Sequence, residues 1–190
     1  MYLIVEGIDT SGKSTQIELL QKLYPDAIIT KEPGGTPIGQ KIRKMILHEG
    51  VNNHKSELFL FLADRAEHYK NIVEPNRDKI VISDRGFISG IAYALANHDY
   101  KKEFLLELNS FALDEKLPDI IILLKTNEKL LKDRMSSKKE DHIEKRGVEY
   151  LLNVQTLMIE LLEDLDINYK IIDASKTIEE IQQEIIEYID

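Results

Sequence analysis

A glycine-rich stretch near the start of the chain carries the strongest chemical signal in the sequence. Residues 7–15 read GIDTSGKST, which fully matches the pattern G-x-x-x-x-G-K-[ST] directly after an apolar run. The glycines of such a loop let backbone N–H groups converge on phosphate oxygens, and the lysine adds a positive charge. The alternative, a glycine turn beside a solvated lysine, fits this context poorly. The stretch therefore predicts a nucleotide phosphate site formed by Gly7, Ile8, Asp9, Thr10, Ser11, Gly12, Lys13, Ser14 and Thr15.

A second signal, an acid beside an arginine, follows an apolar run at residues 79–83. Asp84 stands where the acids of phosphate-loop proteins hold magnesium, often through water, and Arg85 would face the same crevice. Alone, such a pair is more often an ordinary ion pair. Beside a phosphate loop, we expect Ser14 and Asp84 to hold Mg²⁺ and Lys13 to neutralise a departing phosphoryl group.

The segments that would position these groups alternate between short apolar runs and longer stretches with helical spacing. Strands are predicted at residues 2–6, 27–30, 79–83, 120–125 and 169–172. Helices are predicted at residues 13–23, 38–47, 56–73, 89–96, 101–113, 128–136, 147–165 and 177–188. This alternation predicts the α/β P-loop NTPase fold, with a five-stranded parallel sheet, helices on both faces and ligands at the carboxyl ends of the strands.

The composition is that of an ordinary globular protein. Of 190 residues, 43% are hydrophobic and 31% charged, and no linker or repeat divides the chain, so we expect one domain over residues 1–190. No apolar run approaches the roughly 20 residues that cross a bilayer, which predicts no membrane partner. The net charge of −9 argues against binding to nucleic acid polymers. The absence of cysteine excludes disulfides and thiolate sites and favours a cytoplasmic location.

Phosphate loops occur in kinases, GTPases and motor proteins, so the rest of the chain must distinguish these classes. The guanine-reading pattern N-K-x-D is missing near the fourth predicted strand, because residues 126–129 read TNEK. Motor domains usually need a longer chain. A small ATP-dependent kinase is therefore favoured, and a switch that binds ATP but transfers nothing is the less favoured alternative.

Several further motifs follow in a fixed order. They are EGID at residues 6–9 leading into GKST at 12–15, EPGGT at 32–36, IR at 42–43, FLADR at 61–65, DR at 84–85, and Ser89 followed by Ala92-Tyr93. In this ordered set the sequence resembles the bacterial thymidylate kinases, from residue 2 to about residue 150. The resemblance implies transfer of the γ-phosphoryl group of ATP to dTMP with Mg²⁺, and a homodimer.

The resemblance also assigns tasks to matching residues. The arginine matching Arg65 hydrogen-bonds the thymine edge and the phenylalanine matching Phe61 stacks on the base, tasks that suit a guanidinium and an aromatic ring. Arg43 and Arg85 match ligands of the acceptor phosphate, and Tyr93 matches a residue beside the sugar. The implied dTMP site comprises Asp9, Glu32, Pro33, Arg43, Phe61, Arg65, Arg85, Ser89, Gly90 and Tyr93.

These assignments compete with plainer readings of the same residues. Phe61 lies on an apolar helical face and could be a core residue, and Arg65 could pair with a surface acid such as Glu67. Arg43 could be solvated on the polar face of its helix. Tyr93 could serve packing alone.

The chain departs from the family pattern at two positions that bear on specificity. Lys31 replaces an arginine, which keeps the charge but loses the planar fork of donors. Ala94 replaces a glutamine that usually reads the thymine edge. Base selection would then depend on Arg65, water or a neighbour such as Asn97, and a nucleoside or nucleoside-monophosphate kinase of different base specificity remains an alternative.

A charged stretch over about residues 134–146 predicts a short lid. In the bacterial subtype, the resemblance implies, the lid delivers an arginine to the transferring phosphoryl group. Arg134 is the nearest match, and Lys138 and Lys139 could share the task. The predicted catalytic residues are therefore Lys13, Arg85 and Arg134.

Overall fold

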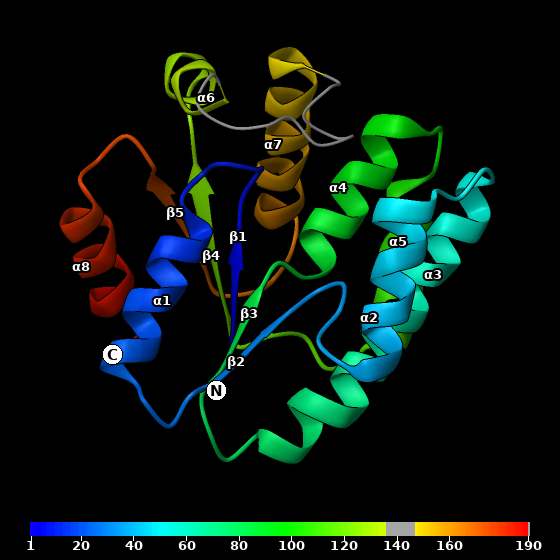
Figure 1. The fold of residues 1–190 in the computed structure, drawn as a ribbon, viewed down its shortest axis with the longest axis horizontal. Coiled ribbons are helices and arrows are strands. Elements are labelled where there is room, and N and C mark those ends of the chain that lie inside the picture. Colours follow the sequence, from blue (N-terminus) through cyan, green and yellow to red (C-terminus); the bar gives the residue numbers. More distant parts are fainter. Residues whose placement is uncertain (136–146, 190) are drawn as a thin grey trace.

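A single five-stranded sheet organises the protein, seen in a computed structural model that describes residues 1–135 and 147–189. The strands lie in the order β2-β3-β1-β4-β5, and each neighbouring pair is parallel (Figure 1). This arrangement confirms the α/β fold with five parallel strands that the sequence predicts. The strands are β1 (Tyr2–Glu6), β2 (Ile28–Lys31), β3 (Val81–Asp84), β4 (Ile120–Lys125) and β5 (Tyr169–Asp173).

Helices cover both faces of the sheet. Among the described residues, none of them has the length and apolarity needed to cross a membrane. Helices α1 and α8 pack together on one face, and α4, α5 and α7 cover the other (Figure 1). The helices are α1 (Lys13–Leu23), α2 (Pro37–Lys44), α3 (His54–His68), α4 (Phe87–Asn97), α5 (Lys102–Ala112), α6 (Glu128–Met135), α7 (Val148–Glu163) and α8 (Ile178–Ile189).

Two predicted helices are shorter in the structure. The stretch predicted as one helix over residues 56–73 divides into α3 and a π-helical segment (Tyr69–Val73), after which a 3₁₀ turn (Glu74–Asn76) contains Pro75. Helix α3 also begins two residues early, because the Asn53 side chain caps it by accepting from the backbone N–H groups of Lys55 and Ser56. The helix predicted over residues 38–47 likewise ends at Lys44 and continues as a π-helical segment.

The other predicted elements are present with small shifts at their ends. The strand predicted over residues 27–30 is β2 (Ile28–Lys31), and that predicted over 79–83 is β3 (Val81–Asp84). The helix predicted over residues 89–96 begins two residues earlier, at Phe87. Ser136, at the predicted end of the sixth helix, lies outside the described residues.

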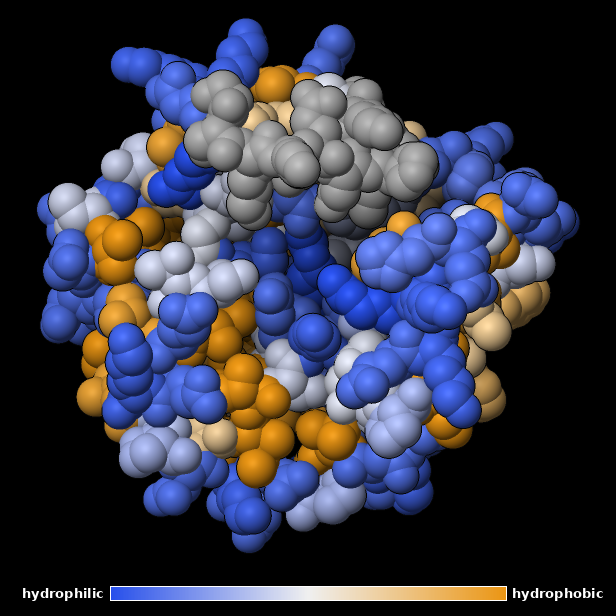
Figure 2. All heavy atoms as spheres, in the orientation of Figure 1, coloured by the Kyte–Doolittle hydropathy of each residue, from blue (hydrophilic) through white to orange (hydrophobic). Residues whose placement is uncertain are grey.

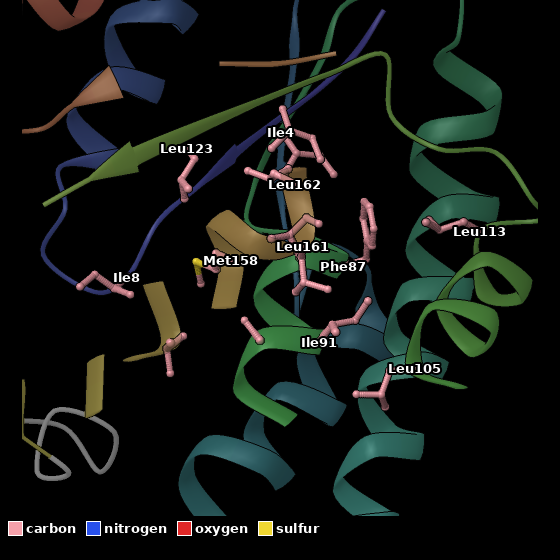
Figure 3. Close-up of a cluster of buried hydrophobic side chains, with 14 of the residues drawn as sticks. Ile4, Ile8, Phe87, Ile91, Leu105, Leu113, Leu123, Met158, Leu161 and Leu162 are labelled. Carbon is pink, nitrogen blue, oxygen red and sulfur yellow. The ribbon is translucent and has the colours of Figure 1, made fainter. Parts of the chain in front are cut away.

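Strand β1 is buried on both faces and separates two apolar clusters. Ile4 points to the cluster beneath α4, α5 and α7, where it meets Leu123, Phe87 and Met158 (Figure 3). Leu3 and Val5 point to the opposite cluster beneath α1 and α8. Continuous burial explains why β1 reads as an unbroken apolar run. It also holds the end of β1 rigidly where the phosphate loop begins.

The strand register brings particular chain positions to one edge of the sheet. Val5 of β1 lies opposite Asp84 of β3, and Lys31 of β2 lies opposite the same Asp84. The segments that follow β1, β2 and β3 therefore leave the sheet side by side. These segments carry most of the side chains singled out by the sequence.

We predict that the apolar cluster beneath α7 carries much of the folding stability. Leu162 is fully buried there, so Leu162→Ala should lower the free energy of unfolding by about 2–5 kcal/mol. Leu23→Ala, on a helix position that is 49% exposed, is the matched control and should change it by less than about 0.5 kcal/mol. Urea unfolding measures both, and equal losses for the two variants would contradict this picture.

Candidate active site

The loop between β1 and α1 turns sharply over the carboxyl edge of the sheet. Gly7 has a φ of +146°, and a Cβ atom at this position would lie 2.6 Å from Ser11 Oγ and 2.9 Å from the Leu124 carbonyl oxygen. Only glycine fits such a turn without displacing the backbone. Gly12, at the N-terminal cap of α1, also has a positive φ of 103°. The backbone N–H groups at the start of α1 consequently face the space above the loop.

Lys13 lies folded back along this loop. Its Nζ donates to the carbonyl oxygens of Gly7 and Ile8, at 2.9 and 3.1 Å, and the side chain is almost completely buried. Burial lowers the pKa of Lys13 to about 7, and the positive charge of Arg85 contributes, while Asp84 opposes the shift. An anion placed beside Nζ would therefore strongly favour the charged form of this lysine.

Arg85 reaches the same carbonyl oxygen from the other side. Its Nη1 donates to Gly7 O at 2.8 Å and to Ser89 Oγ at 3.1 Å, and its Nη2 lies 2.5 Å from Asp9 Oδ1. The guanidinium carbon lies 5.9 Å from the centre of the Tyr93 ring. Gly7 O is thus shared by two cations, and the sequence-predicted residues Asp9, Ser89 and Tyr93 gather around one of them.

A cavity of about 500 Å³ opens above the loop. Figure 2 shows hydrophilic residues lining the hollow in this face of the molecule. The segments after β2 and β3 contribute Lys31, Glu32, Arg43, Asp84 and Arg85 to its wall. Lys176 and Ile178 come from the segment between β5 and the start of α8. In the sheet, β5 lies on the opposite side of β1 from β2 and β3. The cavity therefore has two ends, one on each side of the phosphate loop.

Arg134 joins the phosphate loop to the chain that follows β5. From α6, its Nη1 donates to Thr10 O at 2.9 Å and its Nη2 to Ala174 O at 3.2 Å. Arg134 thus lines the cavity at the end where Lys176 also lies. Lys138 and Lys139, which the sequence also singles out for the lid, lie outside the described residues.

Beside the cavity, α3 buries charged side chains instead of apolar ones. Arg65 is 3% exposed, and its Nε donates to Glu32 Oε2 at 2.8 Å. His68, also buried, places Nδ1 3.0 Å from Glu32 Oε1 and Nε2 2.8 Å from Thr30 Oγ1. The expectation that Arg65 could pair with Glu67 at the surface is therefore wrong. Although burial alone would raise the pKa of Glu32, Arg65 and His68 outweigh it and lower that pKa.

Asp64 holds the segment after β2 against α3. Its Oδ1 accepts from the backbone N–H of Gly34 at 3.0 Å. A side chain at Gly39, at the start of α2, would collide with this carboxylate, so the glycine lets α2 and α3 approach. Burial raises the pKa of Asp64 to about 6, and the nearby charge of Glu32 adds to the shift. Asp64 thereby fixes the backbone beside Glu32 and Pro33.

The remaining predicted residues surround this polar region. Phe61 is half-buried and belongs to neither apolar cluster, which speaks against the core interpretation. Gly90 lies under the Arg65 guanidinium, since a Cβ there would be 3.1 Å from Nη2. Arg43 is half-buried and donates through Nη1 to Pro33 O at 2.9 Å. Tyr93 packs at the margin of the larger cluster.

Sequence reasoning missed three buried polar residues of this region. Glu6 accepts hydrogen bonds from the backbone N–H groups of Gly86 and Ser89 and from Ser89 Oγ, and burial raises its pKa. His68 pairs with Glu32, and Asn109 on α5 accepts from Arg65 Nη1. A signal was present for Asn109, because it lies between Leu105 and Ala112 on the buried face of its helix.

The residues that could hold a metal ion fit a cation that arrives already bound to a nucleotide. Among the described residues, no group of three His, Cys, Asp or Glu side chains could hold a metal ion. Asp84 Oδ1 is buried without a hydrogen-bond partner, while Ser14 lies exposed at the start of α1. One carboxylate and one hydroxyl beside a phosphate site are what Mg²⁺ uses when phosphate oxygens and water complete its shell.

Known proteins with similar sequences all belong to one family. The family model described as "Thymidylate kinase" matches residues 5–185. A thymidylate kinase of Sulfurovum sp. (strain NBC37-1) is 54% identical over 189 residues, covering 100% of this chain and 99% of that protein. Thymidylate kinases of Sulfurimonas denitrificans and Campylobacter concisus are 49% and 50% identical, covering all of this chain and 99% and 98% of their own.

The raised pKa of Asp64 predicts how stability depends on pH. Because the folded-state pKa of about 6 exceeds the usual 3.8, ionising Asp64 costs more in the folded protein, and stability should fall as pH rises between these values. Asp64→Asn removes this titration while its amide oxygen can still accept from Gly34. The variant should gain up to about 3 kcal/mol relative to wild type between pH 4 and 6.

Urea unfolding at several pH values measures this difference. Asp26→Asn, at an exposed position in the loop after α1, is the matched control and should follow the wild-type curve. Parallel pH profiles for Asp64→Asn and wild type would contradict the assignment.

Proposed function

The chain belongs to the thymidylate kinase family, and we propose that the cavity above its phosphate loop is where it transfers the γ-phosphoryl group of ATP to dTMP, giving ADP and dTDP. The observation that carries this assignment is the shared carbonyl oxygen of Gly7, which accepts from Lys13 on one side and from Arg85 on the other. Transfer between two phosphates needs a cation for each substrate close to a common point.

The donor end of the site is assigned to the phosphate loop. The backbone N–H groups of residues 7–15 and the charge of Lys13 would hold the ATP phosphates. In the free protein the Lys13 ammonium rests on backbone carbonyls with a lowered pKa, so phosphate oxygens would offer it a better partner. Arg134, held between Thr10 O and Ala174 O, lies at the end of the loop that is assigned to ATP.

The acceptor end is assigned to the segments after β2 and β3 and to α3 and α4. Arg85 and Arg43 both line the cavity and would bind the dTMP phosphate, and Asp9 beside Arg85 would face the sugar. Tyr93 lies by the same arginine, in keeping with a place next to the sugar. The base would lie between Phe61 and Arg65, with the remaining contacts from Glu32, Pro33, Ser89 and Gly90.

The reaction requires alignment of the two substrates and neutralisation of their phosphate charge more than it requires proton transfer. The phosphate of dTMP is already largely ionised at neutral pH, so an oxygen of the acceptor can attack the γ-phosphorus without a general base. Lys13 would balance charge on the donor, and Arg85 would hold the acceptor in line. Asp84 and Ser14 would hold Mg²⁺, which would supply positive charge to neutralise the donor phosphates.

Exposed aromatic side chains support the proposal of a homodimer. Phe59 on α3 is 61% exposed, and Phe104 and Phe111 on the neighbouring α5 are 47% and 82% exposed. Large apolar side chains gathered on adjacent helices are typical of a subunit interface. We also retain the proposals that residues 1–190 form one kinase domain and that the protein acts in the cytoplasm, as the absence of cysteine favours.

The two alternatives receive less support. A switch that merely binds ATP has no use for Arg43, Arg85 and Asp9 gathered at a second end of the cavity. The alternative of a kinase for another base rests on Ala94, which offers no hydrogen bond to thymine. Asn97, a neighbour that could supply such a bond, has its Oδ1 engaged by the Tyr150 hydroxyl and lies two helical turns beyond Gly90.

The deciding experiment is ADP release from ATP and Mg²⁺ with dTMP, dUMP, CMP or AMP at matched concentrations, each compared with no acceptor. Acceleration by dTMP above the others is expected. Preference for another monophosphate would keep the kinase and overturn the substrate. Equal rates with and without any acceptor would favour the switch.

We predict that Lys13→Ala lowers dTMP-dependent ADP release by at least about 100-fold, as expected when a positioned charge that stabilises the transition state is removed. Lys22→Ala, on the exposed last turn of the same helix, is the control and should keep wild-type turnover. Coupled detection of ADP measures both variants. Near-normal turnover by Lys13→Ala would remove the phosphate loop from the mechanism.

A further inference from the structure

A buried amide on α5 contacts the arginine to which the thymine base is assigned. Asn109 is 2% exposed, and its Oδ1 accepts a hydrogen bond from Arg65 Nη1. Its Nδ2 donates to the carbonyl oxygen of Leu105 in the same helix, at 2.7 Å. Because the amide nitrogen is engaged by its own helix, the amide oxygen is held toward Arg65.

The Arg65 guanidinium is fixed at two points of its plane. Glu32 Oε2 accepts from Nε at 2.8 Å, and Asn109 accepts from Nη1 on the outer side of the group. One bond would leave the guanidinium able to pivot about the Nε contact, whereas two bonds define its plane. The third nitrogen, Nη2, makes no hydrogen bond to the part of the chain that the structure describes. Nη2 therefore keeps both of its N–H groups for a ligand.

The surface of α4 makes room for this donor. A Cβ atom at Gly90 would lie 3.1 Å from Nη2 and 3.4 Å from Nη1, so any side chain there would crowd the guanidinium. Ala94, one helical turn further, brings no hydrogen-bonding group to the same face. Recognition of a base edge at this place therefore falls on Arg65, and its orientation decides what can bind.

Stability alone would favour an apolar residue at position 109. Leu105 and Ala112 occupy the same buried face of α5, and a buried amide gains little over a well-packed leucine. Among the described residues, the only hydrogen bond that the Asn109 side chain makes outside α5 is the one to Arg65. The contact thus serves the arginine.

We propose that Asn109 is a positioning residue for dTMP recognition, which orients Arg65 so that Nη2 faces the base edge of the acceptor. This inference rests on the proposed function, because it needs Arg65 to contact the base. The structure offers the matching chemistry: a guanidinium donor, fixed in its plane, suits the carbonyl oxygen of a pyrimidine base.

The test compares steady-state kinetics of wild type and Asn109→Leu. The variant keeps the branched shape of the side chain but leaves Arg65 Nη1 without its acceptor, so KM for dTMP should rise about 10- to 100-fold, the range for losing one hydrogen bond to a charged group. The KM for ATP and the value of kcat should change little, because a contact made equally in ground and transition states affects KM alone.

Two further variants separate positioning from a general loss of structure. Asn109→Asp keeps an acceptor for Arg65 and should hold KM for dTMP within about 3-fold of wild type. Asn71→Leu removes a similar bond, from Asn71 Nδ2 to the Glu67 carbonyl oxygen four residues earlier, at an exposed position whose side chain makes no hydrogen bond to Arg65. It should leave both KM values unchanged.

Each outcome decides the proposal. An unchanged KM for dTMP in Asn109→Leu, an equal rise in both KM values, or no recovery in Asn109→Asp would overturn the role of Asn109 while leaving the kinase assignment intact. Wild-type protein without dTMP-dependent ADP release would overturn the proposed function and this inference together.

Discussion

Two cations share one carbonyl oxygen, and the rest of the site depends on this contact. Lys13 and Arg85 both donate to Gly7 O, which is possible only because Gly7 adopts a backbone conformation closed to other residues. Like charges so close would repel strongly if Asp9, Asp84 and Glu6 did not lie near them. Burial is the main cause of the lowered pKa of Lys13, and the charge of Arg85 adds to it. Two phosphates would relieve the repulsion between the two cations, which fits the proposal that both substrates meet at this loop.

The sheet order explains how one loop can serve two substrates. Because β1 is flanked by β3 on one side and by β4 and β5 on the other, its loop lies between two sets of strand ends. The segments after β2 and β3 supply acidic and basic groups on the proposed acceptor side, and Arg134 meets the segment after β5 on the proposed donor side. Burial of β1 on both faces keeps this central loop in place.

A buried polar network next to the acceptor side contrasts with the apolar clusters elsewhere. Glu32, Arg65, His68 and Asn109 form this network, in which Arg65 donates to Glu32 and Asn109 and His68 lies against Glu32, so that it links the segment after β2 to α3 and α5. Burying charges is costly unless each is paired, so such a network contributes less to stability than an apolar core would. Its value lies in holding a guanidinium in one orientation. The same network makes the orientation of Arg65 depend on Glu32 and Asn109, which lie on other segments of the chain.

The sequence by itself determined the fold and the phosphate loop, because both depend on local pattern. The apolar runs mark all five strands, and residues 7–15 contain every group of the phosphate loop in one stretch. The Asn53 cap and the two π-helical segments moved helix ends that periodicity could not place. Only the tertiary structure decided the partners of Arg65, because Glu32 and Asn109 lie 33 and 44 residues away and meet it only when strand and helices pack. The burial that turns these pairings into a fixed geometry is likewise a property of the assembled layers.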